Sequence, residues 1–227
     1  MSRLVITIDG PAASGKSTVA RLLADKLNAT FLDTGAMYRA ATLAAIGAGT
    51  DLTDHRRLIE ILDNTKFEFT SSKNGMLVKI NGVDVTEKIR DPQVTASARY
   101  VAGCAPARQR LVEMQRQFAA ANCRIVSEGR DQGTVAFPDA DLKFYLTADL
   151  DERARRRHVE LKAKGIEQTI DQIHDAIRQR DDSDEKRFVG PLKPAADALI
   201  VDTTCLTVEE VLQKLVVILK DKCSEKL

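Results

Sequence analysis

The chain has 227 residues, which is enough to bury a large core either as one domain or as a core with insertions. Its 34 Lys and Arg residues nearly balance its 33 Asp and Glu residues, so the net charge of +1 gives no overall field that would attract nucleic acid or a membrane surface. Because no apolar run is long enough to span a bilayer and the first predicted strand begins directly after Met1-Ser2-Arg3, we expect a cytoplasmic protein without a secretion signal.

The first predicted element is a strand over Leu4–Asp9, and a glycine-rich loop follows it directly. The loop reads GPAASGKS over residues 10–17, which matches the GxxxxGKS pattern of phosphate-binding loops. A helix predicted over Ser17–Leu27 completes the strand, loop and helix context that this motif requires. Glycines let backbone N–H groups and the helix N-terminus face an anion, Lys16 can reach the terminal phosphates, and the Ser17 hydroxyl can ligate Mg²⁺. The motif predicts a nucleoside triphosphate site.

After a second predicted strand at Thr30–Leu32, the regular alternation of strands and helices is interrupted. Three runs alternate apolar and polar residues, and the dipeptides Asn74-Gly75 and Asn81-Gly82 are typical of tight turns. These runs are Lys66–Ser71, Met76–Asn81 and Val83–Thr86. We therefore expect a small antiparallel sheet within an insertion that spans about residues 34–105.

The second half of the chain returns to short apolar runs separated by amphipathic segments. The remaining strands are predicted at Arg124–Ser127, Leu142–Leu146 and Ala198–Asp202. The remaining helices are predicted at Arg56–Asp63, Ala107–Ala120, Asp151–Lys164, Ile170–Arg180 and Val208–Lys222. The last two begin with sequences typical of a capping box, at Thr169 and Thr207. Strands that alternate with helices predict an α/β core whose parallel sheet is covered on both faces.

Two segments carry an unusual density of charge. The helix predicted from Asp151 contains Arg153, Arg155, Arg156 and Arg157, and residues 180–187 read RDDSDEKR. In an average protein, both segments would be interpreted as solvated surface. In a protein that transfers phosphoryl groups, a closing charged lid can instead deliver arginines to the phosphates and exclude water.

The phosphate-binding loop alone does not separate switch proteins, transport ATPases and kinases. The chain contains neither an NKxD-like guanine-reading motif nor a signature such as LSGGQ, which are typical of the first two classes. It does carry Arg39 in DTGAMYR and Arg130 in EGRD. Transfer of a phosphoryl group onto a phosphate requires two anions to be held together, so these additional arginines favour a kinase with a phosphate acceptor.

Five motifs, in this order along the chain, resemble the bacterial cytidylate kinases, which are nucleoside monophosphate kinases that phosphorylate CMP and dCMP from ATP. They are GPAASGKST (10–18), LDTGAMYR (32–39), EGRDQGTVAFPDA (128–140), RDDSD (180–184) and PLKPAADALIVDTT (191–204). The resemblance covers essentially the whole chain. It implies an α/β P-loop kinase core at residues 1–33 and 106–227 with a five-stranded parallel sheet, a helical lid at about 153–187, and a monophosphate-binding insertion at 34–105.

The resemblance also implies roles for the donor site. Lys16 would bridge the β- and γ-phosphates of ATP, and Ser17 and Asp33 are the candidates for Mg²⁺. Asp33 would order water molecules bound to the metal, and an equally good interpretation makes it the cap of the next helix. The ATP phosphates would lie on Gly10, Pro11, Ala12, Ala13, Ser14, Gly15, Lys16, Ser17 and Thr18. The catalytic cations would be Lys16, Arg130, Arg155, Arg157 and Arg180.

For the acceptor site, the resemblance implies that Thr34, Arg39 and Arg130 meet the acceptor phosphate. The planar fork of arginine binds phosphate oxygens in a bidentate manner, so lysine would be a poor substitute. Asp184 resembles an aspartate that contacts the ribose, and Arg187 resembles an arginine that reaches phosphate and ribose.

Two residues would read the base of the acceptor. The resemblance sets Arg108 against the cytosine edge, and Asp131 is suited to accept a hydrogen bond from the exocyclic amine, which uracil lacks. One position departs from the pattern, because Arg99 stands where some relatives have a serine that touches the pyrimidine, and Ser97 lies two residues earlier. Either the alignment slips here or that contact is lost.

We therefore expect an ATP:CMP phosphotransferase that uses Mg²⁺, forms no covalent intermediate and acts as a monomer, since no apolar stripe is left to demand a partner. A kinase for UMP or shikimate and an ATP-binding switch protein are the alternatives. Asp131 and Arg108 argue against shikimate, which offers no base edge. Arginines for a second anion argue against a switch, which needs only one anion site.

Overall fold

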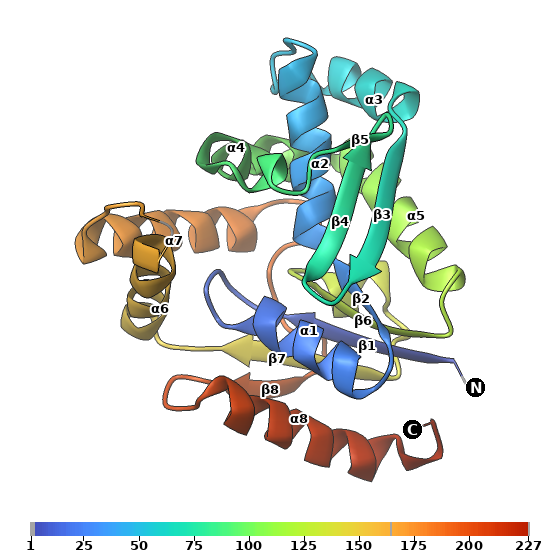
Figure 1. Ribbon diagram of the computed structural model, residues 1–227, viewed down its shortest axis with the longest axis vertical. Helices are drawn as coiled ribbons and strands as arrows, with labels where there is room; N and C mark the ends of the chain where they lie inside the picture. Colours follow the sequence, from blue (N-terminus) through green and yellow to red (C-terminus); the bar gives the residue numbers. More distant parts are fainter. Residues whose placement is uncertain (1–2, 164, 227) are drawn as a thin grey trace.

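A five-stranded parallel sheet forms the centre of the fold (Figure 1). The computed structural model describes residues 3–163 and 165–226, so Lys164, the last residue of one predicted helix, lies outside the described residues. The strand order is β2-β6-β1-β7-β8, which confirms the predicted parallel sheet. The strands are β1 (Leu4–Asp9), β2 (Thr30–Asp33), β6 (Arg124–Gly129), β7 (Leu142–Thr147) and β8 (Leu199–Asp202).

Helices cover both faces of this sheet, which is why the central strand β1 is buried along its whole length. On one face, Leu4, Ile6 and Ile8 of β1 pack in a cluster with α1 (Lys16–Lys26) and α8 (Val208–Lys222). On the other face, Val5 belongs to a second cluster. That cluster is built from α2 (Thr34–Gly47), α3 (His55–Asn64), α4 (Pro92–Gly103), α5 (Ala105–Ala120) and the second sheet. Because successive side chains of a strand point to opposite faces, β1 contributes residues to both hydrophobic cores.

The second sheet is antiparallel and has three strands in the order β3-β4-β5, as predicted. Its strands are β3 (Phe67–Ser72), β4 (Gly75–Ile80) and β5 (Val83–Asp84), and Lys88–Arg90 forms a short 3₁₀ turn after them. Met76 and Val78 of β4 are buried in the cluster that includes α2. Asn81 and Gly82, between β4 and β5, both have positive φ angles of 50° and 80°, which is the geometry that favours Asn-Gly in tight hairpins.

The sequence patterns gave no residue range for α2, although Asp33 was a candidate cap for a helix there, and they did not predict α4. Much of α2 is alanine and most of its turns are buried, so it shows no polar stripe from which a helical period could be read. The start of α4 does carry a signal that went unused, because Asp91 caps it by accepting a hydrogen bond from the Gln93 N–H and Pro92 occupies its first turn. The bounds of the core and of the insertion, residues 1–33, 106–227 and 34–105, stay a prediction.

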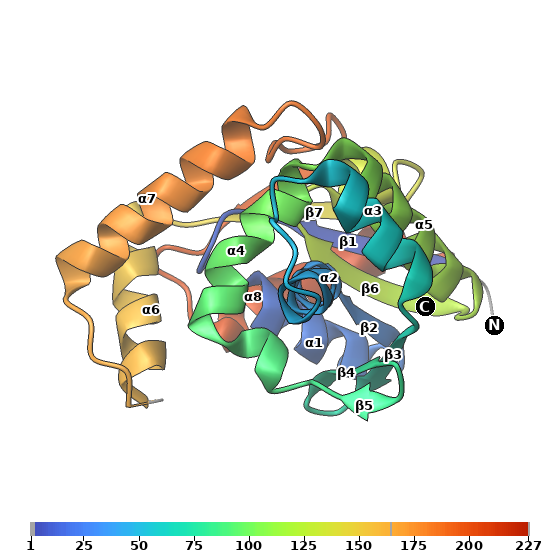
Figure 2. The ribbon, with the colours of Figure 1, turned by 90° about the horizontal axis from the view of Figure 1, so that it is seen from above.

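Two helices stand to one side of the sheet in both views (Figures 1 and 2). They are α6 (Leu150–Ala163) and α7 (Ile170–Lys186), and α7 continues to Lys186 instead of ending at Arg180. The capping boxes predicted at Thr169 and Thr207 are both present. A small apolar cluster of its own joins the two helices to Ala12 of the phosphate-binding loop. Within the described ranges, no helix has the length and apolarity that crossing a membrane would need.

Candidate active site

The phosphate-binding loop lies between β1 and α1, where backbone N–H groups are available to an anion. Gly10 approaches the backbone carbonyl of Leu146 so closely that a Cβ atom would collide with it. Gly15 has a φ of 85°, in the left-handed region, and caps α1 without a side-chain hydrogen bond. The first N–H groups of α1 therefore point out of the helix end without a side-chain acceptor, as anion binding requires.

Lys16, in the first turn of α1, is only 5% exposed and curls back over this loop. Its ammonium group donates a hydrogen bond to the Pro11 carbonyl oxygen at 2.9 Å. The pKa of Lys16 is lowered to about 7, mainly by burial and also by the positive charge of Arg130. A bound anion would relieve both effects, so this part of the site is prepared for negative charge.

Two carboxylates lie side by side at the ends of neighbouring strands. Asp33 ends β2 and is paired in register with Glu128 of β6. The Ser17 hydroxyl donates to Glu128 Oε1 at 2.8 Å. Burial raises the pKa of Glu128, and the charge of Asp33 raises it further. The sequence motifs assign Glu128 no role, although an acidic residue directly after the predicted strand Arg124–Ser127 is a readable signal.

These groups supply hard oxygen ligands, which suit Mg²⁺. Among the described residues no group of three or more His, Cys, Asp or Glu side chains is placed to hold a metal ion. Asp33 also acts as the helix cap that the sequence suggested, because its Oδ1 accepts from the Ala36 N–H at 2.8 Å. Its other oxygen lies 3.2 Å from Arg39 Nη2.

A set of arginines surrounds the single carboxylate of Asp184 near the end of α7. Arg130 Nε donates to Asp184 Oδ2 at 2.8 Å, and Arg187 Nη1 lies 3.3 Å from Oδ1. Burial raises the pKa of Asp184, but the positive charges around it outweigh burial and hold the pKa below its ordinary value. The pKa of Arg180 is lowered to about 10, mainly by burial and also by repulsion from Arg130. Three arginines thus act on one carboxylate here, as expected of a site that binds anions.

Arg108 and Asp131, the two predicted base-reading residues, form an ion pair with each other. They are 2% and 3% exposed. The Arg108 guanidinium lies over the Tyr38 ring, 5.4 Å from its centroid, and the Tyr38 hydroxyl is buried without a hydrogen-bond partner among the described residues. A Cβ atom on Gly190 would collide with both members of the pair, so the backbone of this residue covers them. The structure thus brings together residues from α2, α5 and the turn after β6.

The arginines of α6 differ in what they contact. Arg155 makes two hydrogen bonds of 2.7 Å to Glu152, and Arg157 makes one of 2.7 Å to Glu160. Of the three predicted lid arginines, Arg180 is the one beside Arg130, while Arg155 is held in an exposed ion pair with Glu152. Arg157 is close enough to Arg180 to lower its pKa.

Two further residues, to which the sequence analysis gave no individual role, attach the lid helices to the phosphate-binding loop. Arg153 Nη1 donates to the Ala12 carbonyl oxygen at 3.1 Å, and Asp181 Oδ1 accepts from the Ala12 N–H at 3.2 Å. Arg153 and Asp181 are also paired with each other. Both backbone groups of Ala12 are therefore held by the lid.

Thr34 and Arg99 occupy different surroundings. The buried Thr34 hydroxyl donates to the Glu128 carbonyl oxygen at 2.8 Å, which sets it between the two carboxylate-bearing strands. Arg99 is exposed on α4, and its guanidinium lies 5.0 Å from the centroid of the Tyr100 ring. Ser97, on the same helix, is half-buried.

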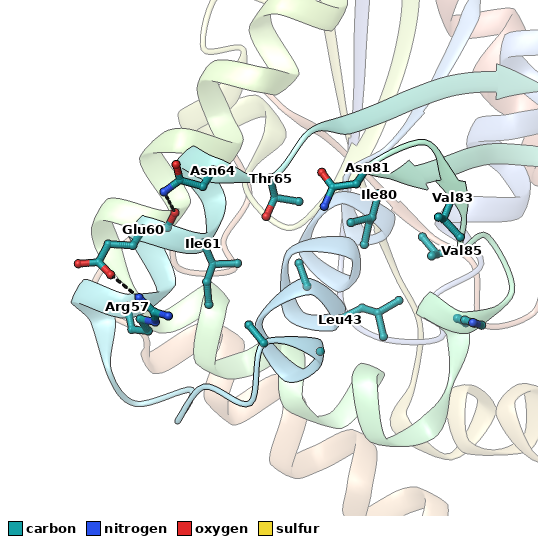
Figure 3. Close-up of a pocket in the computed structure, with 14 residues that line it drawn as sticks. Leu43, Arg57, Glu60, Ile61, Asn64, Thr65, Ile80, Asn81, Val83 and Val85 are labelled. Carbon is teal, nitrogen blue, oxygen red and sulfur yellow. Dashed lines mark hydrogen bonds and ion pairs between the residues drawn. The ribbon is translucent and has the colours of Figure 1, made fainter.

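A cavity of about 650 Å³ lies elsewhere, between α2, α3 and the β4–β5 hairpin (Figure 3). Leu43, Ile61 and Ile80 line it, and the Arg57–Glu60 ion pair stands at one side. None of the residues predicted to bind phosphate lines this cavity. The charge needed to bind phosphates is instead concentrated at the ends of β1, β2 and β6.

Comparisons with known proteins show which family this chain resembles in sequence and in structure. A family model described as cytidylate kinase matches residues 6–221. The cytidylate kinases of Bacillus thuringiensis (strain Al Hakam) and Bacillus cereus (strain AH187) are each 46% identical over 213 residues, covering 94% of this chain and 94% of theirs. An uncharacterized protein from Eubacterium ventriosum ATCC 27560 has a similar structure, with a TM-score of 0.51 and 12% identity over 96% of this chain and 99% of that one. The last similarity shows the fold alone.

Proposed function

The chain belongs to the cytidylate kinase family, and we propose that it transfers the γ-phosphoryl group of ATP to the phosphate of CMP or dCMP in one in-line step. One observation carries the mechanism: a chain of contacts joins the donor loop to the second anion site. Ser17 of the loop bonds Glu128, which is paired in register with Asp33, and Asp33 lies 3.2 Å from Arg39. Two adjoining anion sites are what transfer between two phosphates needs. No covalent enzyme intermediate is required, because positioning and charge neutralisation supply the catalysis.

At the donor site, the N–H groups of residues 10–18 would hold the ATP phosphates, with Lys16 on the β- and γ-phosphates. Ser17 and Asp33 would hold Mg²⁺, and Glu128 joins them as a third oxygen donor. The raised pKa of Glu128 beside Asp33 supports this assignment, because two neighbouring buried carboxylates favour a cation near them. When bound, Mg²⁺ neutralises phosphate charge and orients the oxygens.

At the acceptor site, Thr34, Arg39 and Arg130 would hold the phosphate of CMP, and Asp184 and Arg187 would hold its ribose. The short distances from Asp184 to Arg130 and Arg187 support one continuous site for ribose and phosphate. The same carboxylate keeps these guanidinium groups in place before the acceptor binds.

For the base, the ion pair with Arg108 uses Asp131 Oδ2. We propose that the second oxygen, Oδ1, receives the exocyclic amine of cytosine. Arg108 then has two functions, because it fixes the carboxylate and presents its own N–H groups to the base edge.

The lid would complete the site when both nucleotides are bound. Arg180 already lies beside Arg130, whereas Arg155 and Arg157 would reach the phosphates only after α6 moves. Closure would also exclude water, which otherwise competes as the phosphoryl acceptor. We propose that the protein acts as a monomer and that its compartment is the cytoplasm.

The reaction is tested by measuring ADP release with CMP, dCMP, UMP, AMP and shikimate as acceptors. CMP and dCMP are expected to give the highest kcat/KM values, because they alone among the nucleotides tested present the cytosine amine. A higher value for shikimate would support a shikimate kinase. ADP release at the same rate without any acceptor would favour an ATP-hydrolysing switch.

Substitution of Arg130 or Arg39 by Lys is expected to lower kcat/KM for CMP by about 10- to 100-fold, although the charge is kept. The reason is loss of the planar fork that binds two phosphate oxygens at once. The control is Arg57→Lys, because Arg57 pairs with Glu60 at 2.8 Å on the exposed helix α3. Normal CMP phosphorylation by either site variant would make that arginine a structural ion-pair partner instead.

A further inference from the structure

Asp9, the last residue of β1, is a buried carboxylate to which the proposed reaction gives no task. It directly precedes Gly10 of the phosphate-binding loop and is 4% exposed. Both of its oxygens accept backbone N–H groups from the turn after β6: Oδ1 from Gln132 at 2.8 Å and Oδ2 from Gly133 at 2.8 Å. These two N–H groups immediately follow Asp131, the proposed base-reading residue.

Burying a carboxylate at this position costs free energy of folding, so its presence needs a physical reason. Burial is the main reason that the pKa of Asp9 is raised to about 7, and the two N–H bonds oppose this rise. The charge of Asp131 adds to the rise and the charge of Lys16 opposes it, so groups of both proposed substrate-binding regions act on this carboxylate. The other residues of β1 that pack in the cores are apolar, but an apolar side chain here would leave two buried N–H groups unpaired.

The turn that Asp9 holds has no local cap of its own. Residues Gln132–Ala136 form a π-helical turn, and the Asp131 side chain before it makes no capping hydrogen bond. The Gln132 side chain is fixed from another side, because the Ser127 hydroxyl donates to its Oε1 at 2.8 Å. At Gly133 a Cβ atom would lie 3.0 Å from Thr7 Oγ1 and 3.1 Å from Lys143 Cδ, so the turn packs closely against β1 and β7.

We propose that Asp9 is a positioning residue that fixes the base-reading Asp131 relative to the phosphate-binding loop. It adjoins Gly10 along the chain, and its carboxylate binds the two residues that follow Asp131. Asp131 is in turn paired with Arg108, so a shift of the turn would move both base-reading groups. This inference rests on the proposed role of Asp131 in binding CMP.

The test is Asp9→Asn, which keeps the shape but presents an NH₂ group to one of the two N–H groups. We expect the KM for CMP to rise about tenfold while the KM for ATP changes little, and the preference for CMP over UMP in kcat/KM to fall about tenfold. Asp141→Asn is the matched control. Asp141 accepts a hydrogen bond from the Val5 N–H at 2.8 Å near the opposite end of β1. The Asp141→Asn variant should therefore lower the melting temperature and leave the KM for CMP and the preference for CMP over UMP unchanged.

A second variant moves the same turn without touching the carboxylate. Gly133→Ala pushes the turn away from Thr7 and Lys143, and it should show the same rise in the KM for CMP. If Asp9→Asn does not fold, the KM for CMP of Gly133→Ala alone tests the inference. Folded variants that keep the wild-type KM for CMP and the wild-type CMP-to-UMP preference would overturn the inference. Failure of the wild-type protein to phosphorylate CMP would instead overturn the proposed function.

Discussion

Replacement of Lys16 by Met should reduce kcat by about a hundredfold or more while the fold stays intact. Met has a similar length and no charge, so the variant removes the positive charge that we propose acts on the β- and γ-phosphates. The hydrogen bond to the Pro11 carbonyl is lost as well. Because burial lowers the pKa of Lys16, its charge is a cost to the ligand-free protein, and the melting temperature should be unchanged or slightly higher.

The measurements are steady-state kinetics with CMP and a thermal melt of each protein. Lys66→Met is a suitable control, because Lys66 is an exposed lysine that pairs with Glu68 at 3.3 Å outside the site. A Lys16→Met enzyme with near wild-type kcat would disprove the assignment of the loop to the transferred phosphate. A large fall in melting temperature would show that the lysine is needed for folding rather than for chemistry.

The second large effect concerns the choice of base. Cytosine presents an amine donor where uracil presents a carbonyl acceptor, so the Asp131 carboxylate attracts the first and repels the second. Asp131→Asn is expected to lower kcat/KM for CMP and to raise the ratio of UMP to CMP efficiency by about tenfold or more, since leaving a buried polar group unpaired costs about 1–3 kcal/mol.

The structure sharpens this expectation. In wild type, Arg108 bonds Asp131 Oδ2, and the same guanidinium should retain the amide oxygen of the asparagine. The amide NH₂ then takes the place of Oδ1 and offers a donor to the base, which suits the uracil carbonyl. The loss of a buried ion pair should also lower the melting temperature. If both efficiencies fall by the same factor, base selection depends on another residue, and Arg108 is the next candidate.

The parallel sheet was predictable because its strands are short apolar runs between amphipathic helices. The run Leu4–Ile8 is apolar at four of five positions, and both of its faces are covered. The capping boxes at Thr169 and Thr207 were equally local signals. In contrast, the buried, alanine-rich α2 has no polar face, so its sequence pattern carries little helical period.

For the candidate site, motifs indicated which residues matter but not how they meet. Arg108 lies in a helix with several other charged residues, so the sequence pattern does not show that it is buried beneath Gly190 and paired with Asp131. Glu128 and Asp33 are far apart in sequence, and only the strand order makes them neighbours. Side-chain partners across such distances depend on tertiary packing, which no local pattern encodes.

The contact between the lid and Ala12 has a consequence for protein engineering. Arg153 and Asp181 come from two different lid helices, yet together they bind the N–H and the carbonyl of one residue in the phosphate-binding loop. A chimera that received the lid of another kinase would need to carry both residues, or it would leave a buried charge without its counterpart. The lid is therefore not an exchangeable module, and the smallest unit that can be transplanted includes the loop beneath it.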